Sequence, residues 1–118
     1  MTAEKYNYIL GKLKKSKFRG SFHLVEKDRE VIDEKGMDVI KEHAREILRQ
    51  RIGSLEENDG RQTPWKGHPV FVGQHATATC CRKCLTKWHG MPLARELSEE
   101  EIDYFADLVS EWMKSEMQ

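Results

Sequence analysis

The sequence contains no long run of apolar residues. Its 118 residues include no stretch of the roughly 18 consecutive apolar residues that a membrane-spanning helix needs. The first residues, Met-Thr-Ala-Glu-Lys-Tyr-Asn-Tyr, also lack the apolar core of a secretion signal. Together these absences predict a cytoplasmic protein with no membrane partner.

Cysteine and proline are scarce, with three residues of each. An odd number of cysteines packed between positions 80 and 84 is a poor disulfide framework. In the reducing cytosol expected for a chain without a secretion signal, such thiols stay free or bind metal. The sequence therefore leaves free thiols and metal ligands as the two uses of its cysteines.

Neither sign of charge is in excess, because 20 Lys and Arg residues balance 20 Asp and Glu residues. The two signs are nevertheless separated along the chain. Residues 1–27 carry seven basic and two acidic residues, whereas residues 93–118 carry two basic and eight acidic residues. This separation can attract an anionic partner to one end or draw the two ends together. We favour the intramolecular or solvated interpretation; the candidates for a nucleic-acid site are Lys12, Lys14, Lys15, Lys17 and Arg19.

Apolar residues recur every three or four positions along most of the chain, which is the spacing of amphipathic helices. This pattern predicts helices at residues 3–15, 28–35, 37–52, 76–89 and 98–113. Turn-forming residues indicate a long ordered loop at 54–75, in which 70–72 resembles a strand but is too short for a sheet. We expect a mainly α, single domain over residues 1–118, with about five helices and this loop packed over the cysteine-bearing helix.

The chemically distinctive residues lie between positions 59 and 92, which hold all three cysteines and three of the five histidines. Cys81 and Cys84 have the two-residue spacing of a zinc half-site, and nearby histidines can supply nitrogen ligands. The predicted zinc ligands are His75, Cys81, Cys84 and His89, with His68 and Cys80 as further candidates. Four protein ligands would make the zinc structural, because no position stays open for a catalytic water.

The same cysteines have a second interpretation as ordinary core residues. On one continuous helix, Cys81, Cys84 and Trp88 would share a face. Free cysteine behaves in a core as a small hydrophobic residue. Under this interpretation the thiols would be buried and would bind nothing.

A third interpretation is a reactive thiol. Cys80 and Cys81 lie near the expected beginning of their helix, beside basic residues, and this environment lowers the pKa of a thiol. His68 or His75 would then act as the paired base. His68 also suits a simpler role as a hydrogen-bonding anchor at the end of the loop.

One run of the sequence is distinctive as a whole. Residues 62–92 read Gln-Thr-Pro-Trp-Lys-Gly-His-Pro-Val-Phe-Val-Gly-Gln-His-Ala-Thr-Ala-Thr-Cys-Cys-Arg-Lys-Cys-Leu-Thr-Lys-Trp-His-Gly-Met-Pro. With residues 16–24 and 36–45, this run resembles a family of short bacterial and phage-borne proteins classed as a domain of unknown function. The resemblance implies no activity; the positions to which it draws attention are His68, His75, Cys80, Cys81, Cys84 and His89.

The sequence alone leads to three candidate functions. The first is a zinc-supported binding module whose partner is nucleic acid or a protein. The second is a small enzyme that uses a Cys/His pair or an open metal site within residues 68–89. The third is a structural or partner-binding protein whose cysteines belong to the core.

Overall fold

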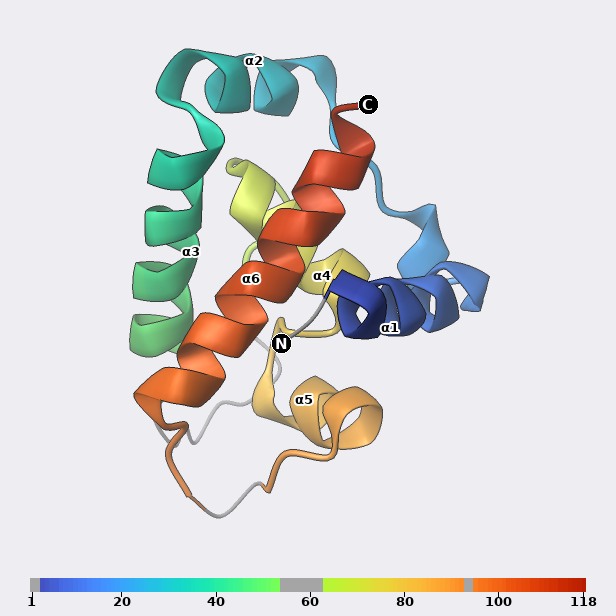
Figure 1. Ribbon diagram of the computed structural model, residues 1–118, viewed down its shortest axis with the longest axis vertical. Coiled ribbons are helices and arrows are strands. Elements are labelled where there is room, and N and C mark those ends of the chain that lie inside the picture. The colour runs from blue at the N-terminus through green and yellow to red at the C-terminus, as the bar shows by residue number, and fades with distance from the viewer. Residues whose placement is uncertain (1–2, 54–62, 93–94) are drawn as a thin grey trace.

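The protein is built from α-helices. The computed structural model describes residues 3–53, 63–92 and 95–118 (Figure 1). Within these ranges the helices are α1 (Ala3–Lys15), the short 3-10 helix η1 (Arg19–Ser21), α2 (Glu26–Lys35), α3 (Met37–Arg51), α4 (Pro69–Thr77), α5 (Arg82–His89) and α6 (Glu99–Glu116). The expectation of a mainly α, small single domain is confirmed. Residues 54–62 of the expected loop lie outside the described ranges.

The C-terminal helix α6 forms the centre of the packing. Figure 1 shows it crossing in front of α4, with α3 alongside. Phe105, Leu108, Val109 and Met113 of α6 are fully buried. The helix begins at a capping box, because the Ser98 side chain accepts from the Glu101 amide and the Glu101 side chain accepts from the Ser98 amide.

Helix α4 is buried over most of its length. It lies where the last part of the loop at 54–75 was expected, so that part of the prediction is wrong. Residues 69–75, expected to end that loop, are helical, as is the strand-like run 70–72. Pro69 occupies the first turn, where its missing N–H costs nothing. A helix that is buried all round lacks the apolar–polar period on which the prediction rests.

The helix expected at 76–89 is two helices rather than one. Helix α4 ends at Thr77, Ala78 adopts a left-handed conformation with φ 60°, and α5 begins at Arg82. Local hydrogen bonds replace the helical ones at this break: the Gln74 side chain donates to the Thr79 carbonyl, and the Thr79 amide donates to the Gln74 carbonyl. Such side-chain bonds compete with helix continuation. The break places Cys80 and Cys81 in the link between α4 and α5.

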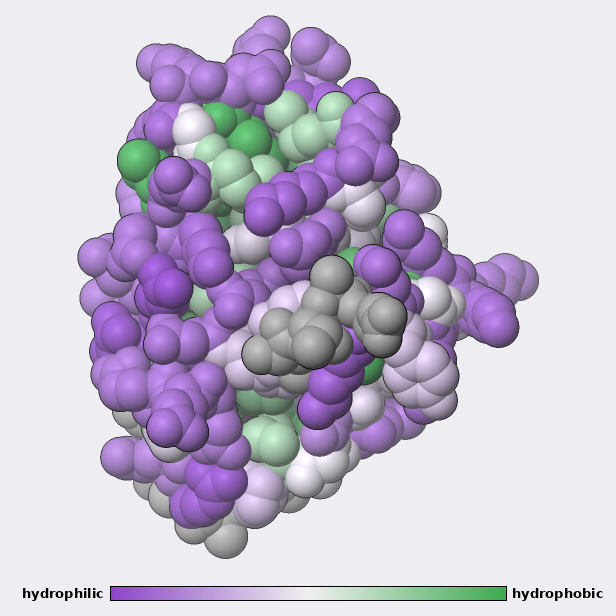
Figure 2. All heavy atoms as spheres, viewed as in Figure 1, coloured by the Kyte–Doolittle hydropathy of each residue, from purple (hydrophilic) through white to green (hydrophobic). Residues whose placement is uncertain are grey.

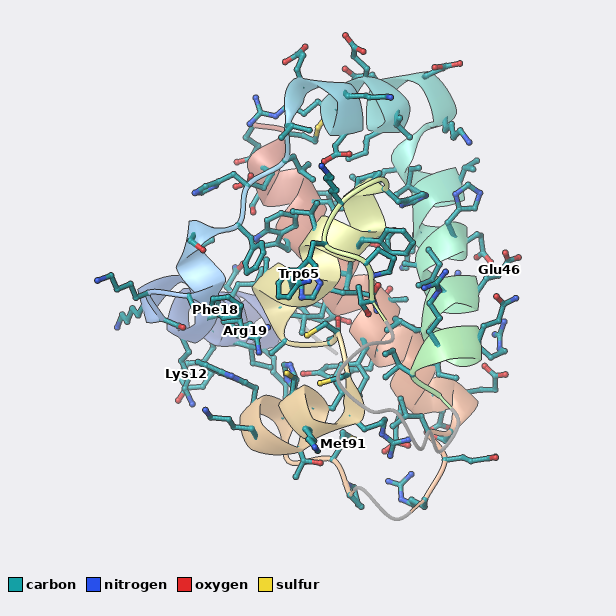
Figure 3. The ribbon with its side chains drawn as sticks, turned by 180° about the vertical axis from the view of Figure 1, so that it is seen from behind. Lys12, Phe18, Arg19, Glu46, Trp65 and Met91 are labelled. Carbon is teal, nitrogen blue, oxygen red and sulfur yellow. The ribbon has the colours of Figure 1, made fainter. Side chains whose placement is uncertain are left out.

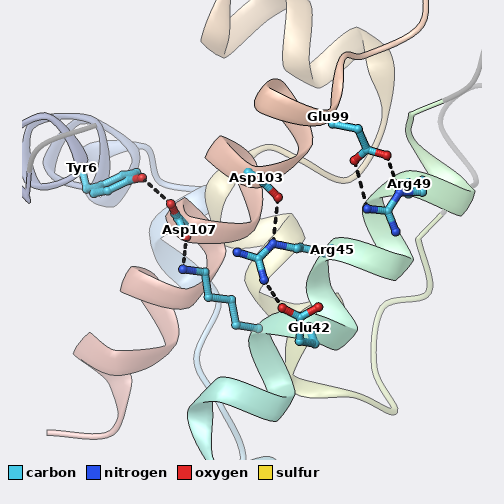
Figure 4. Close-up of polar contacts among 8 residues, drawn as sticks. Tyr6, Glu42, Arg45, Arg49, Glu99, Asp103 and Asp107 are labelled. Atoms are coloured by element: carbon cyan, nitrogen blue, oxygen red, sulfur yellow. Dashed lines mark hydrogen bonds and ion pairs between the residues drawn. The ribbon is translucent and has the colours of Figure 1, made fainter.

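The acidic helix α6 finds its partners on α3. Three pairs join the two helices: Lys41–Asp107, Arg45–Asp103 and Arg49–Glu99 (Figure 4). Arg49 binds Glu99 with two bonds of 2.9 Å each. Exposed pairs of this kind contribute little stability each. They do, however, give Glu99, Asp103 and Asp107 of α6 basic partners on α3, so these three carboxylates need no lysine of α1.

The outer surface is largely polar. Figure 2 shows hydrophilic residues over most of the α6 face, with hydrophobic residues gathered between α2 and the C-terminal end of α6. Among the described residues, no helix combines the length and the apolar character that crossing a bilayer would require.

Candidate metal centre

Three thiols converge at the link between α4 and α5. The Sγ atoms of Cys80, Cys81 and Cys84 all lie within 4.8 Å of one another. The sulfurs of Cys81 and Cys84 are 3.3 Å apart. Cys80 and Cys81 are buried, Cys84 is partly buried, and none of the three is in a disulfide. The arrangement offers three soft ligands at one point.

The backbone of the link holds the sulfurs in place. Cys81 is the N-cap of α5 with an extended backbone, so Cys84 follows one turn later on the same side. From the other side, the hydroxyl of Thr63 donates to the Cys80 carbonyl at 2.8 Å. Residues on both sides of α4 therefore fix the position of the cluster.

Arg19 enters the cluster from a distant part of the chain. Its Nη2 donates to Cys84 Sγ at 3.0 Å and its Nη1 to Cys80 Sγ at 3.5 Å. Nη1 also donates to the His75 carbonyl at 2.8 Å. Arg19 is only 8% exposed, and this corrects its place in the candidate nucleic-acid set. Its guanidinium faces the thiols rather than solvent.

The four lysines of that set lie differently. Lys12, Lys14, Lys15 and Lys17 are all exposed, three on α1 and one just after it. None of them forms an ion pair with any residue that the structure describes. Their charges are therefore available to a partner.

The surroundings shift the pKa values of Cys80 and Cys84 in opposite directions. Hydrogen bonding from Cys80, then from Cys81 and Arg19, lowers the pKa of Cys84 against the opposing effect of burial. The pKa of Cys80 is raised, because it donates to Cys84 and is buried. The cluster thus favours one thiolate, on Cys84, next to a guanidinium and two thiol donors.

His75 lies next to the cluster with one nitrogen unused. Its Nε2 is 3.2 Å from the Pro64 carbonyl, and its buried Nδ1 has no hydrogen-bond partner among the described residues. The ring stacks on Trp65 with 4.0 Å between centroids. Burial lowers the pKa of His75, so the ring is neutral and Nδ1 keeps a lone pair.

The other two candidate histidines make backbone contacts. His89 Nε2 is 2.8 Å from the Thr77 carbonyl, and burial lowers the pKa of His89. His68 caps α4, because its Nδ1 accepts from the Val70 amide at 3.0 Å. The role of loop anchor that the sequence favours for His68 is therefore what the structure shows.

The predicted ligands are only partly brought together. Cys81 and Cys84 are joined by Cys80, which the sequence offered as a further candidate. No histidine nitrogen of the described residues completes a group within 4.8 Å of all three sulfurs. The four-ligand set with His75 and His89 therefore stays a prediction. The continuous-helix interpretation is wrong in its geometry, since Cys81 lies before α5 rather than on a shared helical face.

Comparison with known families places this geometry in context. Residues 7–114 match the family described as Domain of unknown function (DUF4186). The chain belongs to this family. The match covers the cysteine cluster, Arg19 and most of α6, so the cluster is part of the DUF4186 domain. No solved structure matches the chain.

Proposed function

We propose that this DUF4186 protein is a metal-supported binding module, with zinc held by Cys80, Cys81 and Cys84. The observation that carries the proposal is the convergence of the three sulfurs within 4.8 Å. Zinc takes thiolate and imidazole ligands in a tetrahedron, and three thiolates supply most of such a site.

His75 is the fourth ligand that the contacts favour. Metal-binding histidines use one ring nitrogen for the ion and donate the other N–H to a carbonyl or carboxylate. His75 has this arrangement in part, since Nε2 lies against the Pro64 carbonyl and the buried Nδ1 has no partner among the described residues. His89 is the second choice, because its Nε2 already contacts the Thr77 carbonyl and Nδ1 would have to bind.

Arg19 suits a zinc site with three thiolates. One zinc ion and three thiolates leave a net charge of −1, which a neighbouring guanidinium offsets. Its N–H groups already donate to two of the sulfurs, and hydrogen bonds to ligating thiolates are a usual second layer around a metal. With four protein ligands the ion has a structural role, fixing the α4–α5 link.

Metal analysis tests the proposal directly. Protein purified without a histidine tag is expected to contain about one zinc per chain. Cys84→Ser should lose most of the zinc, and His75→Gln should bind it more weakly. His23→Gln is the matched control, because His23 is exposed and contacts Glu116 rather than the cluster. Zinc-free protein that gains no stability from added zinc would reject the proposal.

A reactive thiol is the second candidate, at Cys84 rather than at the predicted Cys80, whose pKa is raised by donation to Cys84 and by burial. The observation that favours it is the set of donors around this sulfur: Arg19 at 3.0 Å and the Cys81 thiol at 3.3 Å. A thiolate stabilised in this way reacts with electrophiles at neutral pH. Iodoacetamide labelling separates the candidates: fast labelling of Cys84 in protein as purified supports the thiol, and labelling only after chelation supports zinc.

A further inference from the structure

Two aromatic side chains lie exposed and next to each other. Trp65 is 62% exposed and Phe18 is 51% exposed, and their ring centroids are 6.4 Å apart. Figure 3 shows both on one side of the molecule, with Lys12 nearby. The Phe22 ring lies next to both, edge-on to Phe18 at 5.2 Å and parallel to Trp65 at 6.1 Å. Adjacent exposed rings of this kind indicate a binding surface rather than scattered apolar residues.

A pocket opens beside these rings. It has a volume of about 510 Å³ and is lined by Phe22, Val25, Val31, Trp65 and Val72, with Lys27 and Lys66 among the other lining residues. The lining is mostly apolar, and the volume falls in the range of small-molecule sites. Asp28 also lines the pocket. A flat uncharged ring system therefore fits inside better than an anion does.

The segments of the chain that carry the rings are basic. In residues 5–27 and 63–67 the exposed charged residues are one glutamate, Glu26, and seven lysines, namely Lys5, Lys12, Lys14, Lys15, Lys17, Lys27 and Lys66. Among the described residues no ion pair joins an α1 lysine to α6: Glu99, Asp103 and Asp107 pair with α3, and Glu101, Glu111 and Glu116 pair with Arg95, Lys114 and His23. The molecule is neutral overall but strongly positive here.

Flat rings beside a row of phosphates are the chemistry of a nucleic-acid strand. Bases stack on exposed aromatic side chains, while lysines along the path bind the backbone. Only a single strand presents the faces of its bases for stacking, because a duplex buries them. An acidic peptide would satisfy the lysines but leave the pocket and the rings without a matching group.

We infer that single-stranded nucleic acid is the partner of this module. It binds a basic aromatic surface formed by Lys12, Lys14, Lys15, Lys17, Phe18, Trp65 and Lys66, with one base in the adjoining pocket. The inference rests on the proposed function, since residues next to the thiol cluster contact both rings. Arg19, next to Phe18, binds the sulfurs, and Trp65 stacks on His75.

Fluorescence anisotropy with a labelled oligothymidine of about 12 nucleotides tests the inference on protein as purified. Binding is expected to weaken with salt, with a slope of log K against log salt near −3 for four lysine contacts. Trp65→Leu should weaken binding about tenfold, whereas Trp65→Phe keeps a stacking ring and should retain most of it. Phe18→Leu should act in the same direction as Trp65→Leu.

The lysines have a matched control elsewhere on the chain. Changing Lys12, Lys14, Lys15 and Lys17 to Gln should abolish measurable binding. Lys35→Gln, at an exposed position of α2, should leave binding unchanged. Equal affinity for duplex and single strands, or equal affinity of Trp65→Leu and the parent protein, would overturn the inference. So would binding only to anionic lipid vesicles or to an acidic peptide.

Zinc content measured on the same samples keeps the two proposals separate. If the protein contains zinc but does not bind the oligonucleotide, the proposed partner is wrong and the proposed metal site is unaffected. Zinc-free protein that binds the oligonucleotide with the stated pattern rejects the metal site and supports the partner.

Discussion

At the scale of single residues, Arg19 has the largest influence on the cluster. It is a buried arginine that donates to two sulfurs and one carbonyl. Sequence reasoning placed it with Lys12, Lys14, Lys15 and Lys17 because it belongs to the same basic segment of the chain. Its partners lie 56 to 65 positions further along the chain, and no local pattern in the sequence records such a contact.

Replacing Arg19 by Met should raise the pKa of the Cys84 thiol. The variant removes a charged donor that favours the Cys84 thiolate. The Cys80 and Cys84 sulfurs and the His75 carbonyl each lose the hydrogen bond that Arg19 donates. The expected cost is about 1–3 kcal/mol of unfolding free energy. Thiolate absorbance against pH in metal-free protein measures the pKa, and urea unfolding measures the stability. Lys17→Met, at an exposed position two residues earlier, should change neither; an unchanged Cys84 titration in Arg19→Met would contradict this role of the guanidinium.

At the scale of helices, the contact between α4 and α6 depends on a glycine. A Cβ built on Gly73 would lie 2.9 Å from Val109 Cγ1 and 3.3 Å from Trp112 Cε3. Both neighbours are buried, so neither can move aside cheaply. The absence of a side chain at Gly73 is what lets α4 lie so close to the central helix.

Gly73→Ala should therefore destabilise the protein by about 1–3 kcal/mol through overpacking. Gly11→Ala is the matched control in α1, because a Cβ added at Gly11 would meet nothing within 4 Å outside its own helix backbone. That change should stabilise the protein by roughly 0.5–1 kcal/mol. Urea denaturation of both variants checks the pair. Similar effects of the same sign would show that helix propensity, rather than the α4–α6 contact, decides the outcome.

Helix α4 also carries a pH-dependent cap. His68 can accept from the Val70 amide only while Nδ1 is unprotonated. Burial, followed by the charges of His43 and Lys35, lowers the pKa of His68 below its usual 6.5. The unfolded chain then binds a proton at higher pH than the folded one, so stability falls as the pH drops below about 6.5.

His68→Asn tests this cap, because asparagine caps helices without titrating. The loss of stability between about pH 7.5 and pH 5.5, on either side of the ordinary histidine pKa, should be smaller in this variant than in the parent protein. His23→Gln, at an exposed position outside α4, serves as the control. A parent and a His68→Asn variant with the same pH dependence would show that the cap does not titrate.

The helices show how far sequence patterns reach. The three helices with one apolar face, α1, α3 and α6, follow the predicted ranges closely, because the spacing of their buried residues is visible in the sequence. Helix α4 was missed because it is buried on every side. The break before α5 was missed because it depends on side-chain bonds of Gln74 and Thr79 rather than on glycine or proline. The spacing of the cysteines in the sequence identified them as candidate ligands. Their three sulfurs meet only because the chain breaks between α4 and α5, which the spacing does not predict.

At the scale of the whole molecule, the cluster and the basic aromatic surface are parts of one packed unit. Trp65 stacks on His75, and Phe18 is adjacent to Arg19 in the chain. If zinc occupies the cluster, its removal by a chelator should lower the Tm and weaken oligonucleotide binding together. Binding energy for a structural metal is also folding energy, which is the reason for the first effect. Thermal melts and anisotropy with and without chelator measure both, and re-addition of zinc should restore them.

The hydrogen bonds of Arg19 to Cys80 and Cys84 join positions 61 and 65 residues apart. During translation the arginine leaves the ribosome well before either sulfur has been made. The lysine-rich beginning of the chain must therefore wait, without its anchor, until more than half of the polypeptide has emerged. Any truncation that stops short of His75 would leave Arg19 with none of these partners, whatever helices the segment forms by itself.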